Sequence, residues 1–259
     1  MNSPVAPVVA LGNVGKSYER GTAALDGFNL TVRAGEFVTL LGPSGCGKST
    51  ALRLIAGLSA PTTGTVETSA RDAGGIGFVF QEPTLMPWAR VADNVRLPLR
   101  LTRAQSDIDA ASSRAAVDRV LAQVGLSDFE NAFPRELSGG MRMRVSIARA
   151  LVTEPQLLLM DEPFAALDEI TRFKLNNELL ALWQELRRTV VFVTHSVFES
   201  VYLSQRIVVM TPRPGRVFAE IEIPAPYPRE DRYRMSLEYA GYCHQVADAL
   251  AGAMAEAGS

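Results

Sequence analysis

The 259-residue sequence lacks the long apolar runs from which membrane-spanning helices are built. No run approaches the roughly 18 to 20 residues needed to cross a bilayer. The longest runs, such as Val190–Val193 and Ile207–Met210, have the length of buried strands. The N-terminus also lacks a basic patch followed by a sustained apolar stretch, so no signal peptide is expected.

Cysteine, histidine and excess charge are equally scarce. The two cysteines, Cys46 and Cys243, cannot make a disulfide framework and fit a reducing, cytoplasmic setting. A formal net charge of −2 gives no electrostatic reason to expect nucleic acid as a partner. The sequence contains two histidines, of which His244 is interpreted as structural, and it has no internal repeat.

What the sequence does have is a 47% apolar fraction arranged as short strands alternating with helical patterns. This alternation predicts an α/β fold with a mostly parallel sheet, preceded by an N-terminal antiparallel β portion. A helix is expected over Ser49–Gly57. The expected strands are Val8–Val14, Leu25–Val32, Glu36–Leu41, Ile76–Phe80, Gln156–Met160, Thr189–Thr194 and Ile207–Met210.

A helical subdomain is expected to interrupt this core. Its helical pattern is predicted to begin near Thr102, because Thr102 and Gln105 have capping-box spacing. An amphipathic stretch that includes Val117 and Leu121 stops at Gly125. The expected division is a nucleotide-binding core over 1–84 and 152–215, a helical subdomain over 85–151, and a C-terminal extension over 216–259. The extension is expected to end in a helix with Tyr239, Cys243, Val246 and Leu250 on one face.

The segment Gly42–Thr50 matches the phosphate-loop pattern G-x-x-x-x-G-K-[ST] between a predicted strand and a predicted helix. Its glycines let backbone N–H groups turn toward a phosphate at a helix N-terminus. Lys48 supplies positive charge for the outer phosphates, and the Ser49 hydroxyl can ligate Mg²⁺. The loop predicts nucleotide binding.

Cys46 lies inside this loop at a position that the pattern leaves free. It can be a small residue that simply fits. Alternatively, the helix N-terminus can lower its pKa, so that alkylation would block nucleotide binding.

An acidic pair follows the apolar segment Leu157–Met160. The carboxyl ends of parallel strands are where α/β sheets place ligands. Asp161 is therefore a candidate for holding Mg²⁺, and Glu162 for orienting or deprotonating the attacking water in phosphoryl transfer.

The segment Leu137–Met141 distinguishes among phosphate-loop proteins. Ser138 is expected to cap the helix that ends near Leu151, and two glycines follow it. A serine-capped helix start with exposed N–H groups predicts a second anion site.

With these motifs in this order, the chain resembles the ATP-binding subunits of ABC transporters, which have a P-loop NTPase (RecA-like) core. The resemblance covers roughly Val8 to Gly215. It implies that Tyr18 stacks on adenine, that Gln81 touches Mg²⁺ and senses the membrane subunit, and that His195 contacts the γ-phosphate. It also implies that Ala166–Asp168 form the loop that crosses the dimer. Taken singly, Tyr18 would more often be an ordinary packing residue and Gln81 an ordinary loop residue.

The resemblance implies a set of site residues, with ATP and Mg²⁺ as cofactors. The expected catalytic residues are Lys48, Gln81, Glu162 and His195, and the expected metal ligands are Ser49, Gln81 and Asp161. The residues expected around the nucleotide are Tyr18, Gly42, Pro43, Ser44, Gly45, Cys46, Gly47, Lys48, Ser49, Thr50, Ser138, Gly139, Gly140 and Asp168. The sequence departs from the commonest family pattern at Met143, Ala165 and Ser196.

The segment Met210–Arg216 and the segment Phe133–Leu137 are similar to bacterial importers of the nitrate, sulfonate and taurine group. This similarity implies a homodimer of ATPase subunits at the cytoplasmic face of the inner membrane, beneath separate permeases and an extracytoplasmic solute-binding protein. Leu85, Met86 and Trp88 are expected to pack locally or to dock a helix of the permease. The alternatives are a non-transport ABC ATPase acting in translation or on DNA, and a phosphate-loop kinase or GTPase.

Overall fold

Two sheets and three groups of helices make up the chain. The computed structural model describes residues 6–18, 21–70, 75–102 and 109–256. The small sheet is antiparallel, with the strand order β2 (Ala23–Val32), β1 (Val9–Ser17) and β4 (Thr63–Thr68). The large sheet has the order β5 (Ile76–Val79), β6 (Leu157–Asp161), β7 (Thr189–Thr194), β3 (Phe37–Leu41), β8 (Arg206–Met210) and β9 (Val217–Glu222).

The large sheet is parallel except at one edge, where β9 pairs antiparallel with β8. The mostly parallel core and the antiparallel N-terminal sheet are both confirmed. The strands β4 and β9 were not predicted. Because β9 pairs with β8, the expected boundary before residue 216 falls between two strands of one sheet.

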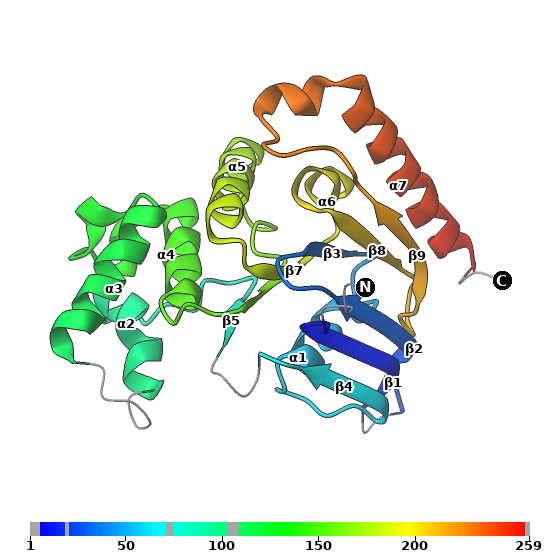
Figure 1. The fold of residues 1–259 in the computed structure, drawn as a ribbon, viewed down its shortest axis with the longest axis horizontal. Coiled ribbons are helices and arrows are strands. Elements are labelled where there is room, and N and C mark those ends of the chain that lie inside the picture. Colours follow the sequence, from blue (N-terminus) through cyan, green and yellow to red (C-terminus); the bar gives the residue numbers. More distant parts are fainter. Residues whose placement is uncertain (1–5, 19–20, 71–74, 103–108, 257–259) are drawn as a thin grey trace, which may run out of the picture.

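The helices form layers on either side of the large sheet (Figure 1). Helix α1 (Lys48–Ile55) packs between the two sheets, whereas α5 (Glu169–Leu186), α6 (Val197–Leu203) and α7 (Leu237–Glu256) cover the opposite face. The helices α2 (Val91–Thr102), α3 (Ala110–Gln123) and α4 (Gly139–Leu151) form a separate group beyond β5. Short 3₁₀ turns lie at η1 (Ser127–Phe129), η2 (Pro134–Glu136) and η3 (Asp231–Met235).

The prediction that a helix begins near Thr102 is wrong. Thr102 is the last residue of α2, and α3 begins at Ala110. The N-cap of α3 is Asp109, whose carboxylate accepts a hydrogen bond from the Ser112 N–H at 2.7 Å. Gln105 lies outside the described residues.

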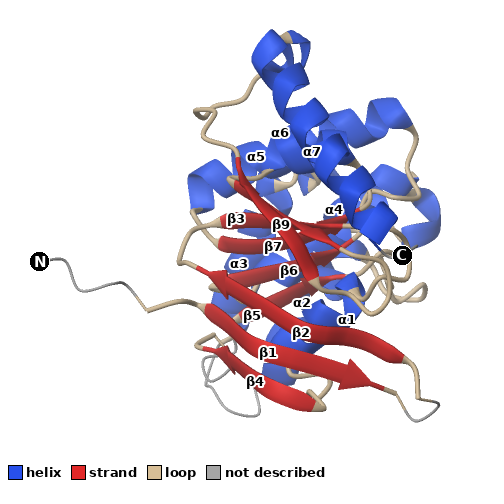
Figure 2. Ribbon diagram, turned by 90° about the vertical axis from the view of Figure 1, so that its right-hand side faces the viewer, coloured by secondary structure: helices blue, strands red, loops and turns tan. Residues whose placement is uncertain are grey.

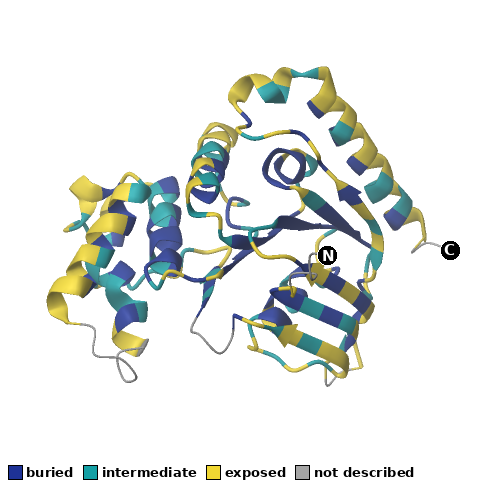
Figure 3. Cartoon of the chain, viewed as in Figure 1, coloured by how far each residue is buried: buried dark blue, intermediate teal, exposed yellow. Residues whose placement is uncertain are grey.

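The alternation of side chains along the central strands divides the core between the two faces of the large sheet. On β3, Phe37 and Leu41 face the helical layer, whereas Val38 and Leu40 face α1 and the small sheet. Figure 3 shows that the large sheet is buried along most of its length. A sheet covered on both faces needs apolar residues at successive positions, which explains the uninterrupted apolar runs of the sequence.

Helix α7 lies against α6, β8 and β9, and Figure 2 shows this helix from the side. Its buried side chains include Tyr239, Cys243 and Val246. Leu250 is only partly buried on the same side, and Ala253 continues the buried face. Among the described residues, no helix has both the length and the apolar character needed to span a bilayer.

Candidate functional site

The phosphate loop connects the carboxyl end of β3 to α1. Gly45 and Gly47 have φ values of 77° and 111°, in the left-handed region that favours glycine. A Cβ on Gly47 would lie 2.6 Å from the Ala24 carbonyl oxygen, so only glycine fits there. The buried Lys48 ammonium donates to the Gly42 and Pro43 carbonyl oxygens at 2.9 and 3.0 Å. These contacts fix the lysine side chain inside the loop it is expected to serve.

The Ser49 hydroxyl donates to the Asp161 carboxylate at 2.8 Å, which joins α1 to the end of β6. Burial raises the pKa of Asp161, although the hydrogen bond from Ser49 opposes this shift. The described residues contain no cluster of three or more His, Cys, Asp or Glu side chains that could hold a metal by themselves. Ser49 and Asp161 instead offer two neighbouring oxygens, which is the donor set that Mg²⁺ uses when phosphates and water complete its shell.

Glu162 lies between Lys48 and His195. Its carboxylate is 3.5 Å from the Lys48 Nζ and 3.1 Å from the His195 Nδ1, and its side chain is 18% exposed. The Glu162 backbone has a φ of 45°, which is uncommon for a residue with a side chain. Its N–H donates to the Val193 carbonyl oxygen at 3.0 Å, so β7 helps to hold this conformation. Residues in such conformations are often found at functional sites.

Two neighbours of the phosphate loop come from distant parts of the chain. The half-exposed Tyr18 places its hydroxyl 3.4 Å from the Thr50 hydroxyl, so its ring lies beside the start of α1. Arg213 donates from Nε to the Gly45 carbonyl oxygen at 3.1 Å. Gly215 packs directly on the loop, because a Cβ there would lie 2.1 Å from the Cys46 carbonyl oxygen. The sequence predicted Tyr18 near the nucleotide but missed Arg213.

The structure contradicts the hypothesis of a reactive Cys46. Its side chain is 1% exposed, and burial raises the pKa of the thiol, although the nearby Lys48 opposes this shift. The helix N-terminus therefore does not make this cysteine acidic. The structure favours the alternative that Cys46 is a small residue that fits the loop.

The second predicted anion site lies at the start of α4. Ser138 is the N-cap of this helix and accepts a hydrogen bond from the Met141 N–H at 3.2 Å. Gly140 packs against the start of α5, since a Cβ there would lie 2.8 Å from the Thr171 Cγ2. Asp168 caps α5, and the hydrogen bonds that it accepts from Thr171 hold the pKa of its carboxyl below the usual range.

The predicted site residues therefore form two clusters. The first joins the phosphate loop with Asp161, Glu162 and His195, and the second joins Ser138–Gly140 with the Asp168 loop. No hydrogen bond or ion pair between described residues links Ser138–Gly140 to the phosphate loop.

Gln81 lies two residues after the end of β5 and is exposed. Near it, a groove of about 330 Å³ separates β5 from α2; it is lined by Ile76, Gly77, Phe78, Phe80, Thr84, Leu97, Pro98, Leu101, Arg149, Ala150 and Thr153. Phe78 and Phe80 stack with ring centroids 4.3 Å apart, and Arg149 donates to the Pro83 and Thr84 carbonyl oxygens. Of the three residues expected to dock a permease, Leu85 packs against the core and Trp88 is 77% exposed.

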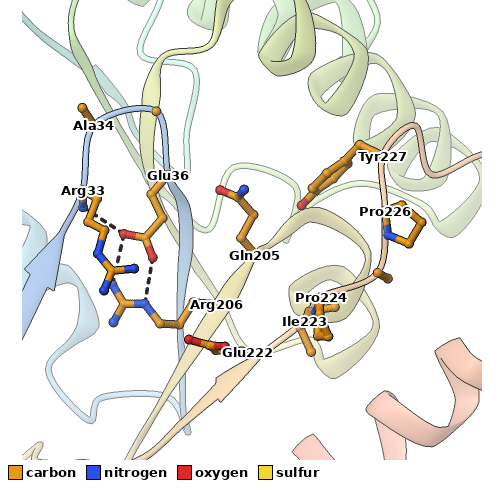
Figure 4. Close-up of a pocket in the computed structure, with 12 residues that line it drawn as sticks. Arg33, Ala34, Glu36, Gln205, Arg206, Glu222, Ile223, Pro224, Pro226 and Tyr227 are labelled. Atoms are coloured by element: carbon orange, nitrogen blue, oxygen red, sulfur yellow. Dashed lines mark hydrogen bonds and ion pairs between the residues drawn. The ribbon is translucent and has the colours of Figure 1, made fainter. Parts of the chain in front are cut away.

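A larger cavity of about 490 Å³ lies at the opposite, amino end of β3 and β8 (Figure 4). Arg206 in its wall is already paired: its guanidinium donates to Glu36 at 2.8 Å and to Glu220 at 2.6 Å. Ligands of α/β sheets bind beyond the carboxyl ends of the strands. The carboxyl end, which carries the phosphate loop and Glu162, is therefore the candidate site.

Comparisons with known proteins agree with this geometry. The family model described as ABC transporter matches residues 25–165. An aliphatic sulfonates import ATP-binding protein of Bacillus licheniformis is 44% identical over 221 residues, covering 83% of this chain and 84% of that protein. An uncharacterized ABC transporter ATP-binding protein of Methanocaldococcus jannaschii is 48% identical over 231 residues, covering 88% and 84%.

Solved structures show the same fold. The ATP-binding cassette MJ0796, solved as a dimer in a post-hydrolysis state with ADP and Pi, aligns with a TM-score of 0.73 at 36% identity, covering 84% of this chain and 100% of that chain. CbiO1 of Clostridium perfringens, part of the ABC transporter complex cbiONQ, aligns with a TM-score of 0.76 at 26% identity, covering 93% and 99%. This chain therefore belongs to the ABC transporter family, as one of its ATPases.

Proposed function

We propose that two copies of this chain close around two ATP molecules and drive an importer for small sulfonates or similar solutes, such as taurine or nitrate. In this assembly the chain lies at the cytoplasmic face of the inner membrane, beneath separate permease subunits. An extracytoplasmic solute-binding protein would deliver the solute.

The separation of the two anion sites carries the dimer proposal. The phosphate loop and the Ser138 helix start each offer backbone N–H groups to phosphate, yet within the described part of the chain they do not contact each other. A second copy in a two-fold arrangement can present its Ser138 to the first copy's nucleotide, and the reverse holds by symmetry. The solved dimer of a related cassette supports this arrangement.

The first cluster supplies the groups that hydrolysis needs. Lys48 neutralises charge on the outer phosphates, and Tyr18 stacks on the adenine. Glu162 orients the attacking water and takes its proton, while His195, 3.1 Å from that carboxylate, contacts the γ-phosphate. The strained Glu162 backbone aims the carboxylate between Lys48 and His195 before substrate arrives.

We propose Ser49, Asp161 and Gln81 as the residues that hold Mg²⁺, directly or through water. The ion would supply charge neutralisation between the β- and γ-phosphates. The Ser49 hydroxyl oxygen and an Asp161 carboxylate oxygen are 2.8 Å apart, so two of these oxygen donors are neighbours.

The groove between β5 and α2 is the proposed contact for the permease. Its walls are mostly apolar, and the exposed Gln81 lies in sequence between the lining residues Phe80 and Thr84. A short amphipathic helix fits such a groove by inserting apolar side chains. Affinity capture with this chain is expected to recover a multi-span membrane protein, and Phe80→Glu is expected to abolish that capture.

The class of solute rests on relatives named for aliphatic sulfonate import. The solute would be bound by the permease and the binding protein, so this chain does not select it. Titrating the partner solute-binding protein with a sulfonate, taurine and nitrate would identify which of them it takes.

Replacing Glu162 with glutamine tests the function of this chain directly. Glu162→Gln keeps the size of the side chain but removes the base, so we expect turnover to fall by at least about 100-fold. The variant is expected to elute from gel filtration as a dimer with ATP and Mg²⁺ and as a monomer without them.

The matched control is Glu185→Gln, an exposed glutamate near the far end of α5. This control is expected to hydrolyse ATP at the rate of the unmodified chain. A Glu162→Gln variant that binds ATP and still elutes as a monomer would contradict the proposal.

A further inference from the structure

Only the N-cap residue Ser196 separates His195 from helix α6. Strand β7 ends at Thr194, and Ser196 caps α6 by accepting a hydrogen bond from the Glu199 N–H at 3.3 Å. The buried Glu199 carboxylate in turn accepts a hydrogen bond from the Thr194 hydroxyl. His195 is thus held between two residues that are tied to the first turn of α6, so the position of α6 determines where the histidine lies.

The far end of α6 is capped by side chains of the C-terminal extension. A helix leaves its last carbonyl groups without partners, and a helix of seven residues has little stability of its own. The Arg229 guanidinium donates to the Val201, Tyr202 and Ser204 carbonyl oxygens at 2.8, 3.0 and 2.9 Å. The Tyr227 hydroxyl donates to the remaining one, that of Leu203, at 3.0 Å.

Arg229 also anchors the segment that carries it. Its guanidinium donates to the Ile223 and Ala225 carbonyl oxygens at 3.1 Å each, and it lies 4.2 Å from the centroid of the Tyr227 ring. Arg229 is 4% exposed, and no carboxylate in the described part of the chain forms an ion pair with it. The Nη1 and Nη2 donors of this buried arginine reach carbonyl oxygens, whereas its Nε has no hydrogen-bond partner in the described structure. Arg229 therefore fixes backbone geometry rather than balancing a charge.

Two further contacts hold α6 along its length. The Tyr239 hydroxyl donates to the Phe198 carbonyl oxygen at 2.9 Å, in the first turn of α6. The Arg234 guanidinium carbon lies 3.3 Å from the centroid of the Tyr202 ring and 4.8 Å from that of Phe173 on α5. Residues 223–239, named here the C-terminal strap, therefore contact α6 at both ends.

We propose that the C-terminal strap positions His195 for hydrolysis by holding α6 in place, with Arg229 and Tyr239 as positioning residues. This inference rests on the proposed function, which assigns His195 to the γ-phosphate. Neither residue contacts the nucleotide site itself, so both act through α6.

The strap is expected to affect turnover but not ATP binding. The groups that grip the nucleotide come from β1 and from the loop between β3 and α1, which the strap does not contact in the described structure. By contrast, the His195 Nδ1 and the Glu162 carboxylate are 3.1 Å apart, and this contact tolerates little displacement of the histidine.

Two variants test the inference without removing the strap. Arg229→Lys keeps the charge but loses the forked geometry, and Tyr239→Phe removes one hydroxyl. We expect kcat to fall about 10-fold in the first and about 3-fold in the second, with the KM for ATP within about 2-fold of the parent value. Tyr242→Phe is the matched control, because it removes a hydroxyl from the same helix and, in the described structure, Tyr242 makes no hydrogen bond to α6.

A double-variant comparison separates positioning from general loosening. If the strap acts through His195, adding Tyr239→Phe to His195→Ala should leave the residual single-turnover rate unchanged, because the effects of coupled residues do not multiply. Independent, multiplying effects would overturn the inference. A folded Arg229→Lys variant with the parent kcat would also overturn the inference. If Arg229→Lys fails to fold, the test is made with Tyr239→Phe alone. The parent chain and Glu162→Gln are assayed beside them, and a parent chain that hydrolyses no ATP would overturn the proposed function instead.

Discussion

Cys46 lies inside the phosphate loop but is closed off from solvent, and burial raises the pKa of its thiol. Only the thiolate reacts with alkylating reagents. We therefore expect iodoacetamide at neutral pH to leave Cys46 unmodified in the folded chain and to modify it after unfolding in urea, as measured by mass spectrometry. Rapid alkylation of the folded chain, prevented by ATP, would instead restore the reactive-thiol hypothesis.

Asp161 has a raised pKa because it is buried, so its neutral form is favoured more in the folded chain than in the unfolded chain. Below the pKa of an unfolded aspartate, about 4, the carboxyl is protonated in both states. As the pH rises through the higher pKa of the folded state, the buried charge lowers the free energy of unfolding. We expect Asp161→Asn, which keeps an oxygen acceptor for Ser49, to melt at a higher temperature than the parent near neutral pH.

This advantage should disappear as the pH falls toward about 4. Thermal melts without nucleotide and Mg²⁺ over that pH range measure it. The same variant should lose Mg²⁺-dependent hydrolysis. An equal melting temperature for both chains at every pH would show that burial does not affect the Asp161 charge.

The residues of the phosphate loop and the acidic pair could be predicted from the sequence because their spacing is local. Lys48, Ser49, Asp161 and Glu162 do lie together in the structure, and their chemical roles remain predictions. Arg213 could not be predicted, since its contact with Gly45 depends on how β8 and the turn after it return to the loop. Local spacing carries no information on such a contact.

At the scale of elements, the start of α4 has two separable properties, a helix cap and an anion site. Ser138→Ala removes the cap and should lower the free energy of unfolding by about 1 kcal/mol. Ser138→Asp keeps a good capping oxygen but adds a negative charge where a phosphate is expected. We therefore expect Ser138→Asp to melt like the parent chain and to lose at least about 10-fold in ATPase activity at low salt.

Asp168→Ser at the start of α5 is the corresponding change at a neighbouring cap. It exchanges one capping residue for another and should leave the melting temperature nearly unchanged. Ser138→Asp with full ATPase activity would show that this helix start never meets a phosphate.

The predicted strands of the large sheet and the missed strand β4 differ in their apolar content. The predicted strands of the large sheet are continuous apolar runs, because both faces of that sheet are covered. Strand β4 (Thr63–Thr68) is mostly exposed, and Val66 is its one large apolar residue. Its pairing with β1 therefore cannot be predicted from an apolar pattern. The start of α3 was misplaced because Thr102 and Gln105 imitate a cap, while the actual cap, Asp109, lies about two turns before the buried Val117.

At the scale of the whole molecule, the two anion sites predict a composite active site shared between copies. A Lys48→Ala copy has a defective phosphate loop, and a Ser138→Asp copy has a defective Ser138 helix start. In a mixed dimer one site carries both defects and the other carries neither. Equal mixing should therefore restore about a quarter of the parent single-turnover activity, because about half the dimers are mixed and half their sites are intact.

Each variant alone, at the same total concentration, is the control and should stay near the background rate. A mixture no more active than the sum of its components would contradict the sharing of one site between two copies.

The two tryptophans of the chain lie in opposite surroundings. Trp183 is 3% exposed, packs edge-on against Phe37 and donates to the Arg188 carbonyl oxygen, whereas Trp88 is 77% exposed in the segment between β5 and α2. Because indole emission shifts to the blue when water is excluded, the intrinsic fluorescence divides into a blue component from the core and a red component from one surface position. The emission of Trp88 therefore reports on any partner that covers this surface. The emission of Trp183 is the internal reference, because it stays constant as long as the fold is intact.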